Sequence, residues 1–177
     1  AIIYTITEDC NGQLWIGTFS SGVFVFNSNK RLVIHLDDSN YLKSNTINHI
    51  ICDKDGGIWI GTAKGLAYVA NPLKPQDIRI YDERQGIKDS HIRAICQDRQ
   101  GNMWVSMFSG IACLDMRRQR FHNYDYHNGI PTGNFVEASA AISPDGAIYF
   151  GSPSGVCYFT PQTIKSPQSV PQVQIIS

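Results

Sequence analysis

The sequence predicts an all-β protein assembled from four similar units, and the main observation behind this prediction is a repeat. Four aromatic residues, Trp15, Trp59, Trp104 and Tyr149, are separated by 44, 45 and 45 residues. Glycines recur in nearly the same register, at positions 12, 57, 101 and 146 before the aromatic residue and at positions 22, 65, 110 and 155 after it. A period in the forties with several short strand-like segments per unit is typical of β-propeller blades. We therefore expect a β-propeller fragment of about four four-stranded blades.

The second unit can be divided into four strands from its residue types alone. Ile47–Asp53 forms the first strand, and the turn "DKDGG" follows, since aspartate and glycine favour tight turns. Ile58–Thr62 and Gly65–Val69 form the second and third strands. Asp77–Asp82 alternates polar and apolar residues, as a half-exposed outer strand should.

The repeated tryptophan motif is interpreted as structural. Successive side chains of a strand point to opposite faces, so Trp59 is expected to pack on one neighbouring blade, and Ile58 and Ile60 on the other. Glycines allow a tight turn and close approach of backbones. The residues assigned to this structural repeat are Trp15, Trp59, Trp104, Tyr149, Gly17, Gly61 and Gly151.

The predicted organisation places the propeller in residues 1–161, with repeats near 1–40, 41–84, 85–129 and 130–161. Residues 162–177 are rich in proline and serine, which predicts a linker followed by the first strand of a β-sandwich domain at Val173–Ile176. The chain begins in strand-like sequence, which suggests a piece of a longer protein. The end blades would then expose apolar faces, and we expect self-association, with two partial propellers completing one another.

Composition limits the classes of partner. Equal numbers of acidic and basic residues give a formal net charge of zero, so no electrostatic argument favours nucleic acid or an anionic membrane surface. The five cysteines do not match the spacing of a zinc site. They are interpreted as small apolar strand residues, with one disulfide left open for an oxidising compartment. No cofactor and no metal are expected.

The segment "DKDGGIWIGTAKGLAYV" closely resembles the two-component regulator propeller repeat. The segment "NGIPTGNFVEASAAISPDGAIYFGSPSGVCYFTPQTI" resembles the last blade of that family, which precedes a small β-sandwich. Ser106 departs from the family pattern at the glycine of the second strand, and Tyr149 and Phe150 depart from its Trp-Ile pair. We expect these changes to leave the architecture intact, with a different turn after the second strand of the third unit.

The resemblance implies a function as well as a fold. Propellers of this family form the periplasmic sensor of hybrid two-component systems, which are common in gut Bacteroidetes, and a transmembrane helix outside this chain connects the sensor to a cytoplasmic histidine kinase. Their ligands are oligosaccharides released from complex glycans. The resemblance therefore implies a ligand-sensing module without phosphotransfer chemistry of its own.

Ligand contacts are expected in the turns between second and third strands and in the linkers between blades, since loops carry specificity on a repeated framework. Sugar recognition calls for aromatic rings for stacking and planar hydrogen-bonding groups around them. The stacking candidates are Phe19, Tyr41 and Phe108. The polar candidates are Asn48, Lys64, His91, Arg93, Asn134 and Glu137.

Two other functions remain open from the sequence. One is a propeller lyase, in which His91 would act as general base. The other is a protein-docking scaffold with no small ligand. A metal site is not expected at "HNYDYH", because His122 and His127 would point to opposite faces of a strand, and no G-x-S-x-G nucleophile motif is present.

Overall fold

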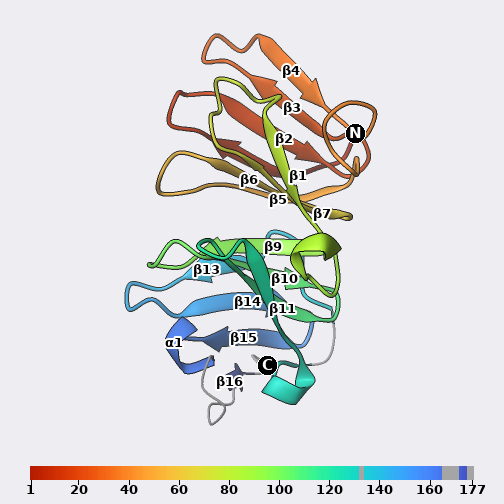
Figure 1. Ribbon diagram of the computed structural model, residues 1–177. Coiled ribbons are helices and arrows are strands. Elements are labelled where there is room, and N and C mark those ends of the chain that lie inside the picture. The colour runs from red at the N-terminus through yellow and green to blue at the C-terminus, as the bar shows by residue number, and fades with distance from the viewer. Residues whose placement is uncertain (132–133, 165–171, 175–177) are drawn as a thin grey trace.

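A computed structural model describes residues 1–131, 134–164 and 172–174, and these residues form four four-stranded sheets (Figure 1). Blade 1 contains β1 (Ile3–Glu8), β2 (Leu14–Thr18), β3 (Val23–Phe26) and β4 (Leu32–Leu36). Blade 2 contains β5 (Ile47–Cys52), β6 (Ile58–Thr62), β7 (Gly65–Val69) and β8 (Ile78–Tyr81). Blade 3 contains β9 (Ile92–Gln97), β10 (Met103–Met107), β11 (Gly110–Asp115) and β12 (Arg120–Tyr124). Blade 4 contains β13 (Ala140–Ile142), β14 (Ile148–Ser152), β15 (Gly155–Phe159) and β16 (Gln172–Gln174).

Each blade is an antiparallel meander whose strands follow chain order, so the predicted all-β propeller architecture is confirmed. The strands of the second unit agree with the prediction to within one residue at each end. The first strands of successive blades are neighbours: β1 lies against β5, β5 against β9, and β9 against β13. Figure 1 shows the blades following one another from the N-terminal to the C-terminal end. The short segments outside the strands are η1 (Glu83–Gln85), η2 (Tyr126–Asn128) and α1 (Pro161–Ile164).

The second strand of each inner blade is apolar on both sides because it joins two interfaces. Trp59 belongs to the core between blades 2 and 3, together with Ile92 and Val105. Ile58 and Ile60 belong instead to the core between blades 1 and 2. The predicted division of these side chains between neighbouring blades is confirmed.

A hydrogen bond to an aspartate orients each of the three tryptophans. The indole Nε1 donates to an aspartate Oδ2 six residues earlier, at 2.9 Å in Trp15–Asp9, 2.8 Å in Trp59–Asp53 and 2.9 Å in Trp104–Asp98. The other carboxylate oxygen accepts two backbone N–H groups of the turn between first and second strands. One side chain therefore closes the turn and fixes the ring that covers the next blade.

Blade 4 replaces both members of this pair. Ser143 takes the aspartate position, and its Oγ accepts from the Ala147 N–H at 3.1 Å. Tyr149 takes the tryptophan position and stacks on Tyr158, with ring centroids 5.5 Å apart. Tyr149 is only half-buried, because no further blade among the described residues covers this face. The serine keeps the turn closed without needing an indole partner.

Glycines in the second strands leave room for side chains of the first strands. A Cβ at Gly17 would lie 2.6 Å from side-chain carbons of both Ile47 and Thr5, and one at Gly61 would lie 2.8 Å from Ile92. Ser106, the departure in blade 3, is fully buried, and its Oγ accepts from the Ala94 N–H at 3.1 Å. The register between β9 and β10 shifts next to this residue. The serine hydroxyl thus satisfies a backbone donor at the shift.

Two details differ from the sequence-based assignment. The turn glycine of blade 2 that matches Gly12, Gly101 and Gly146 is Gly56 rather than Gly57, since these four share a positive φ. The strand containing Val173 pairs with β15 and completes blade 4, where the sequence suggested the start of another domain. The linker expected between them, residues 165–171, lies outside the described residues.

The outer face of blade 1 is apolar and exposed. Ile3 and Ile6 on β1 are 53% and 60% exposed. Leu14 and Ile16 occupy the positions at which Ile58 and Ile60 are buried in blade 2, yet both are half-exposed. An unpaired blade face was expected, whereas the self-association it would drive stays a prediction.

Replacing Asp98 by alanine tests the aspartate–tryptophan bond. The change leaves the Trp104 indole N–H and two turn N–H groups without their acceptor, and we expect a loss of about 3 kcal/mol in the free energy of unfolding. Asp77→Ala, at an exposed position, should cost less than about 0.5 kcal/mol. Urea unfolding followed by tryptophan fluorescence measures both values, and equal losses would show that the bond is unimportant.

His49 makes stability depend on pH. Burial lowers the pKa of His49 to about 4, and its Nδ1 accepts from the Ile95 N–H of the next blade at 3.0 Å. Because the unfolded state keeps a pKa near 6.5, the contribution is complete above that pH and is lost as the pH falls towards 4. It amounts to about 3 kcal/mol.

A threonine supplies the matched variant for this pH dependence. Thr5 occupies the equivalent position in blade 1, where its Oγ1 accepts from the Ile50 N–H at 3.2 Å. His49→Thr should therefore retain the acceptor and reduce the loss of stability between pH 6.5 and 4, measured by thermal unfolding. His122→Gln, on an exposed side chain, should leave the profile unchanged. If His49→Thr lost as much stability between pH 6.5 and 4 as the native protein, His49 would not be the cause of the pH dependence.

Candidate functional site

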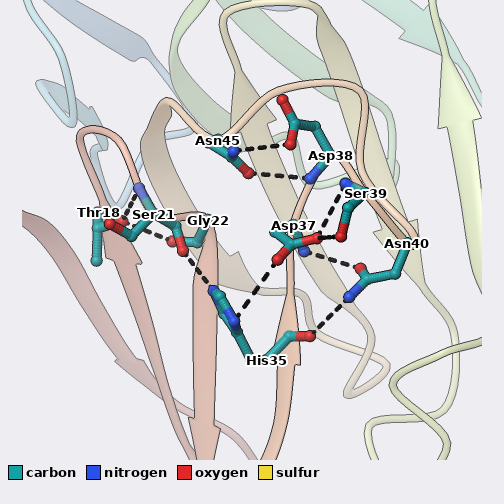
Figure 2. Close-up of polar contacts among 9 residues, drawn as sticks. All are labelled: Thr18, Ser21, Gly22, His35, Asp37, Asp38, Ser39, Asn40 and Asn45. Atoms are coloured by element: carbon teal, nitrogen blue, oxygen red, sulfur yellow. Dashed lines mark hydrogen bonds and ion pairs between the residues drawn. The ribbon is translucent and has the colours of Figure 1, made fainter.

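The linkers between blades begin with a repeated turn. The backbone N–H of Asp37 donates to Asn40 Oδ1 at 2.9 Å, and Asp37 Oδ1 accepts from the Ser39 N–H at 2.9 Å (Figure 2). Asp82 with Gln85, and Asp125 with Asn128, form the same reciprocal pair. The first half of each linker is therefore framework, although the sequence analysis treated the whole linkers as variable loops.

Ion pairs connect consecutive linkers. Lys43, six residues after Asp37, pairs with Asp82 of the next linker. Lys88, six residues after Asp82, pairs with Asp125 at 3.5 Å. Hydrogen bonds from Arg84 and then Lys43 hold the pKa of the buried Asp82 carboxyl well below its usual range. These ion pairs tie the linker that precedes blade 2 to the linker that follows it, and the linker that precedes blade 3 to the linker that follows it.

On blade 1 the polar groups of this face mostly bind one another. His35 Nε2 lies 2.6 Å from the Ser21 carbonyl oxygen, and His35 Nδ1 lies 3.6 Å from Asp37 Oδ2 (Figure 2). Asn45 and Asp38 exchange two bonds, at 2.8 and 2.9 Å. This network orders the turn and the linker and accounts for their polar side chains.

On blade 3, by contrast, three of the predicted residues meet in one cluster. Arg93 forms an ion pair with Glu137, and its guanidinium carbon lies 5.8 Å from the centroid of the Phe108 ring. The Arg93 side chain is only 15% exposed, and its Nε has no hydrogen-bond partner among the described residues. A largely buried cation with one unpartnered N–H, beside an exposed ring, is a feature of a binding site more than of a framework.

His91 lies near this cluster. Burial and the neighbouring Arg93 charge lower the pKa of His91, so the imidazole is neutral at pH 7. Its backbone N–H donates to Asp89 Oδ1 at 2.9 Å. His91 therefore shares the electrostatic environment of Arg93, and the structure brings together His91, Arg93, Phe108 and Glu137.

Phe108 also borders a pocket of about 350 Å³. The pocket lies between the turn that follows β10 and the linker that leads from blade 3 to blade 4, and Asn134 is on its wall. Its aromatic lining is completed by Tyr124 and Tyr126, and its polar lining includes Lys88, Ser109, Asn123 and Asp125. Tyr126 is 62% exposed, so a face of this ring is open to a ligand.

Several pocket groups are already fixed by the framework. Asn123 accepts from the Lys88 N–H at 3.0 Å and donates to the Gly86 carbonyl at 2.7 Å. The Ser109 N–H and hydroxyl both contact Asp89 Oδ2. Burial raises the pKa of Tyr124 to about 12, so its hydroxyl stays protonated. The pocket wall is thus rigid on its blade 3 side, which favours a preformed site.

The remaining predicted residues lie outside this cluster. Phe19 is exposed on the turn of blade 1 and packs against Tyr4, with ring centroids 5.5 Å apart. Tyr41 is exposed on the first linker, and Lys64 is exposed in the turn of blade 2. Asn48 is only 1% exposed because its Nδ2 donates to the Ile92 carbonyl of the next blade, at 2.7 Å. This bond makes Asn48 part of the framework, and it offers no surface for the ligand contact expected of it.

The sequence analysis missed Tyr126, Ser109 and Asn123. Tyr126 begins a linker in which ligand contacts were expected, but its segment "HNYDYH" was considered for a metal site and the ring was not named as a stacking candidate. In the structure Asp125 caps η2, and His127 lies in that turn. Among the described residues, no group of three histidine, cysteine, aspartate or glutamate side chains is arranged to hold a metal ion.

A family model for the two-component regulator propeller matches residues 41–64 and 86–109. These repeats are two-component regulator propeller repeats. The matched segments run from the linkers through the second strands of blades 2 and 3, and they contain both Trp59 and Trp104. No helix of the described residues of this propeller is long and apolar enough to cross a membrane.

Two relatives support this assignment. The extracellular domain of a hybrid two-component system from B. thetaiotaomicron is 36% identical, with a TM-score of 0.88, over 94% of this chain and 23% of that domain. Histidine kinase P4 of Formosa agariphila is 24% identical over 97% of this chain and 16% of the kinase. The propeller described here therefore spans less than a quarter of either relative.

A lyase shares the fold at greater distance. Virginiamycin B lyase from Staphylococcus aureus is 16% identical, with a TM-score of 0.70, over 90% of this chain and 53% of the lyase. At this identity the likeness concerns the propeller architecture alone.

Proposed function

We propose that this propeller is part of the extracytoplasmic sensor of a hybrid two-component histidine kinase and that it binds glycan-derived oligosaccharides in the pocket beside Phe108. The observation that carries the proposal is the joint presence of exposed rings, Phe108 and Tyr126, and polar side chains around one cavity. The likeness to the extracellular domain of a hybrid two-component system supports the sensor role.

The chemistry of the pocket suits a neutral, hydroxyl-rich ligand. Sugar rings present apolar C–H faces that stack on aromatic rings, while their hydroxyl groups need both donors and acceptors. Asn134 provides both and is exposed at the pocket wall. Lys88 and Asp125, both in the pocket lining, form an ion pair and compensate one another, so no net charge favours an ionic ligand.

The position of the pocket suits a sensing role. Its two walls come from a turn of blade 3 and from the linker to blade 4, so a ligand would contact two segments that β11 and β12 separate in the sequence. A ligand changes a conformational equilibrium only if it binds one state better than the other. A site that bridges two segments meets this requirement whenever their spacing differs between states.

Phe108→Ala, compared with Phe19→Ala, tests the ligand site. The two rings occupy equivalent turns and are 49% and 46% exposed. The loss of a stacking ring should weaken oligosaccharide binding about two- to tenfold in Phe108→Ala, since ring contacts contribute about 0.5–1.5 kcal/mol. Phe19→Ala should bind normally. Thermal shift with glycan-derived oligosaccharides, followed by titration calorimetry of the ligands that bind, measures the effect.

The outcomes separate the three functions considered. Equal binding by both variants would exclude the pocket as the site, and no thermal shift with any oligosaccharide would favour a protein-docking scaffold. Recovery of a cleaved oligosaccharide, abolished in His91→Gln, would favour a lyase. Recovery of the intact ligand after binding supports the sensor.

A further inference from the structure

The turns between first and second strands make a repeated contact with the following blade. Cys10, Lys54 and Arg99 each follow the aspartate of their turn directly. A Cβ on Gly56 would lie 3.2 Å from Cys10 Sγ, and one on Gly101 would lie 3.3 Å from Lys54 Nζ. A Cβ on Gly146 would lie 3.3 Å from Arg99 Cδ. In each case the side chain covers the turn glycine of the next blade.

A second contact accompanies the first. The Lys54 N–H donates to Gln97 Oε1 at 3.0 Å, and Gln97 is the last residue of β9, directly before Asp98. Cys52 holds the same position in blade 2, as the last residue of β5 directly before Asp53. The repeat therefore places Cys52 opposite Cys10, as it places Gln97 opposite Lys54.

The electrostatic environment of Cys52 agrees with this placement. Burial raises the pKa of the Cys52 thiol, the Cys10 sulfur raises it further, and the Cys10 backbone N–H lowers it. Both the sulfur and the amide of Cys10 are thus close enough to act on Cys52. Cys10 is exposed and Cys52 is half-buried, whereas Cys96, Cys113 and Cys157 are buried in the blades.

We propose that Cys10 and Cys52 form a disulfide that joins blade 1 to blade 2. The exposed Cys10 thiolate attacks a disulfide of oxidised glutathione or of a dithiol oxidoreductase, forming a mixed disulfide and releasing one thiolate. The Cys52 thiolate then attacks the Cys10 sulfur and expels the second carrier thiolate. The two cysteines lose two electrons and two protons, and the carrier disulfide becomes two thiols.

The bond would close a loop of about 40 residues that contains most of blade 1 and the linker to blade 2. By restricting the unfolded chain, it should raise the melting temperature by about 5–10 °C. Its formation in the cell rests on the extracytoplasmic location in the proposed function, since disulfides persist in oxidising compartments. The ability of the two cysteines to form the bond does not depend on that location, because the pair can be oxidised in vitro.

The experiment incubates the purified native protein with oxidised glutathione and then maps its peptides without reduction. We expect one peptide linking Cys10 to Cys52, a fall from five to three titratable thiols in denaturant, and a higher melting temperature that dithiothreitol reverses. Cys10→Ser and Cys52→Ser should each retain four free thiols and melt as the reduced protein does.

A transposed pair provides the matched control. Lys54→Cys with Gln97→Cys, in the Cys10→Ser, Cys52→Ser background, should form the corresponding bond between blades 2 and 3. Five free thiols after oxidation of the native protein, a link to another cysteine, or a dimer joined through Cys10 would overturn the proposal. Either result leaves oligosaccharide binding at Phe108 unaffected, so the two proposals fail separately.

Discussion

The hydrogen bond between a turn aspartate and a tryptophan indole is the interaction on which this propeller depends. In blades 1–3 the carboxylate accepts the indole N–H and two turn amides, so the turn cannot open without releasing the ring. The ring in turn forms one side of the next interface: Trp59 packs among blade 3 residues, and Trp104 among blade 4 residues. The packing of each blade on the next therefore follows from a local bond, which explains why aspartate and tryptophan keep a constant spacing of six residues.

The fold could be predicted because the repeat is carried by residues whose roles are local. Tryptophan spacing, strand alternation and turn glycines located the strands of blade 2 to within one residue. The aspartate partner was missed because an aspartate before glycine already indicates a turn, and nothing in the sequence shows that its second oxygen reaches an indole. β16 was assigned elsewhere because a proline-rich segment separates it from β15, and only strand pairing shows that it returns to blade 4.

Individual residues of the candidate site could be predicted from the sequence, but which of them lie together could not. Phe108, Arg93 and Glu137 were chosen for their chemistry, and the structure brings them together because β9 lies beside both β10 and β13. Asn48 failed as a surface residue because its strand turns that position towards the next blade. The linker turns were taken as variable. In all three, however, an aspartate is followed three residues later by Asn or Gln, and the two side chains form the same turn.

Chemical differences between the blades arise where equivalent positions carry different residues on one framework. The residue eleven before the aromatic and the residue four after it are such positions, and they hold Tyr4 with Phe19, Asn48 with Ala63, Arg93 with Phe108, and Ala138 with Pro153. In blade 1 the two rings pack on each other, and in blade 2 the amide binds the next strand. Only the blade 3 pair, among these described residues, combines a largely buried charge with an exposed ring beside a pocket. The rigid repeat thus places equivalent positions in each of the four blades. Specificity can evolve at the position in one blade without disturbing the bonds that hold the other three blades.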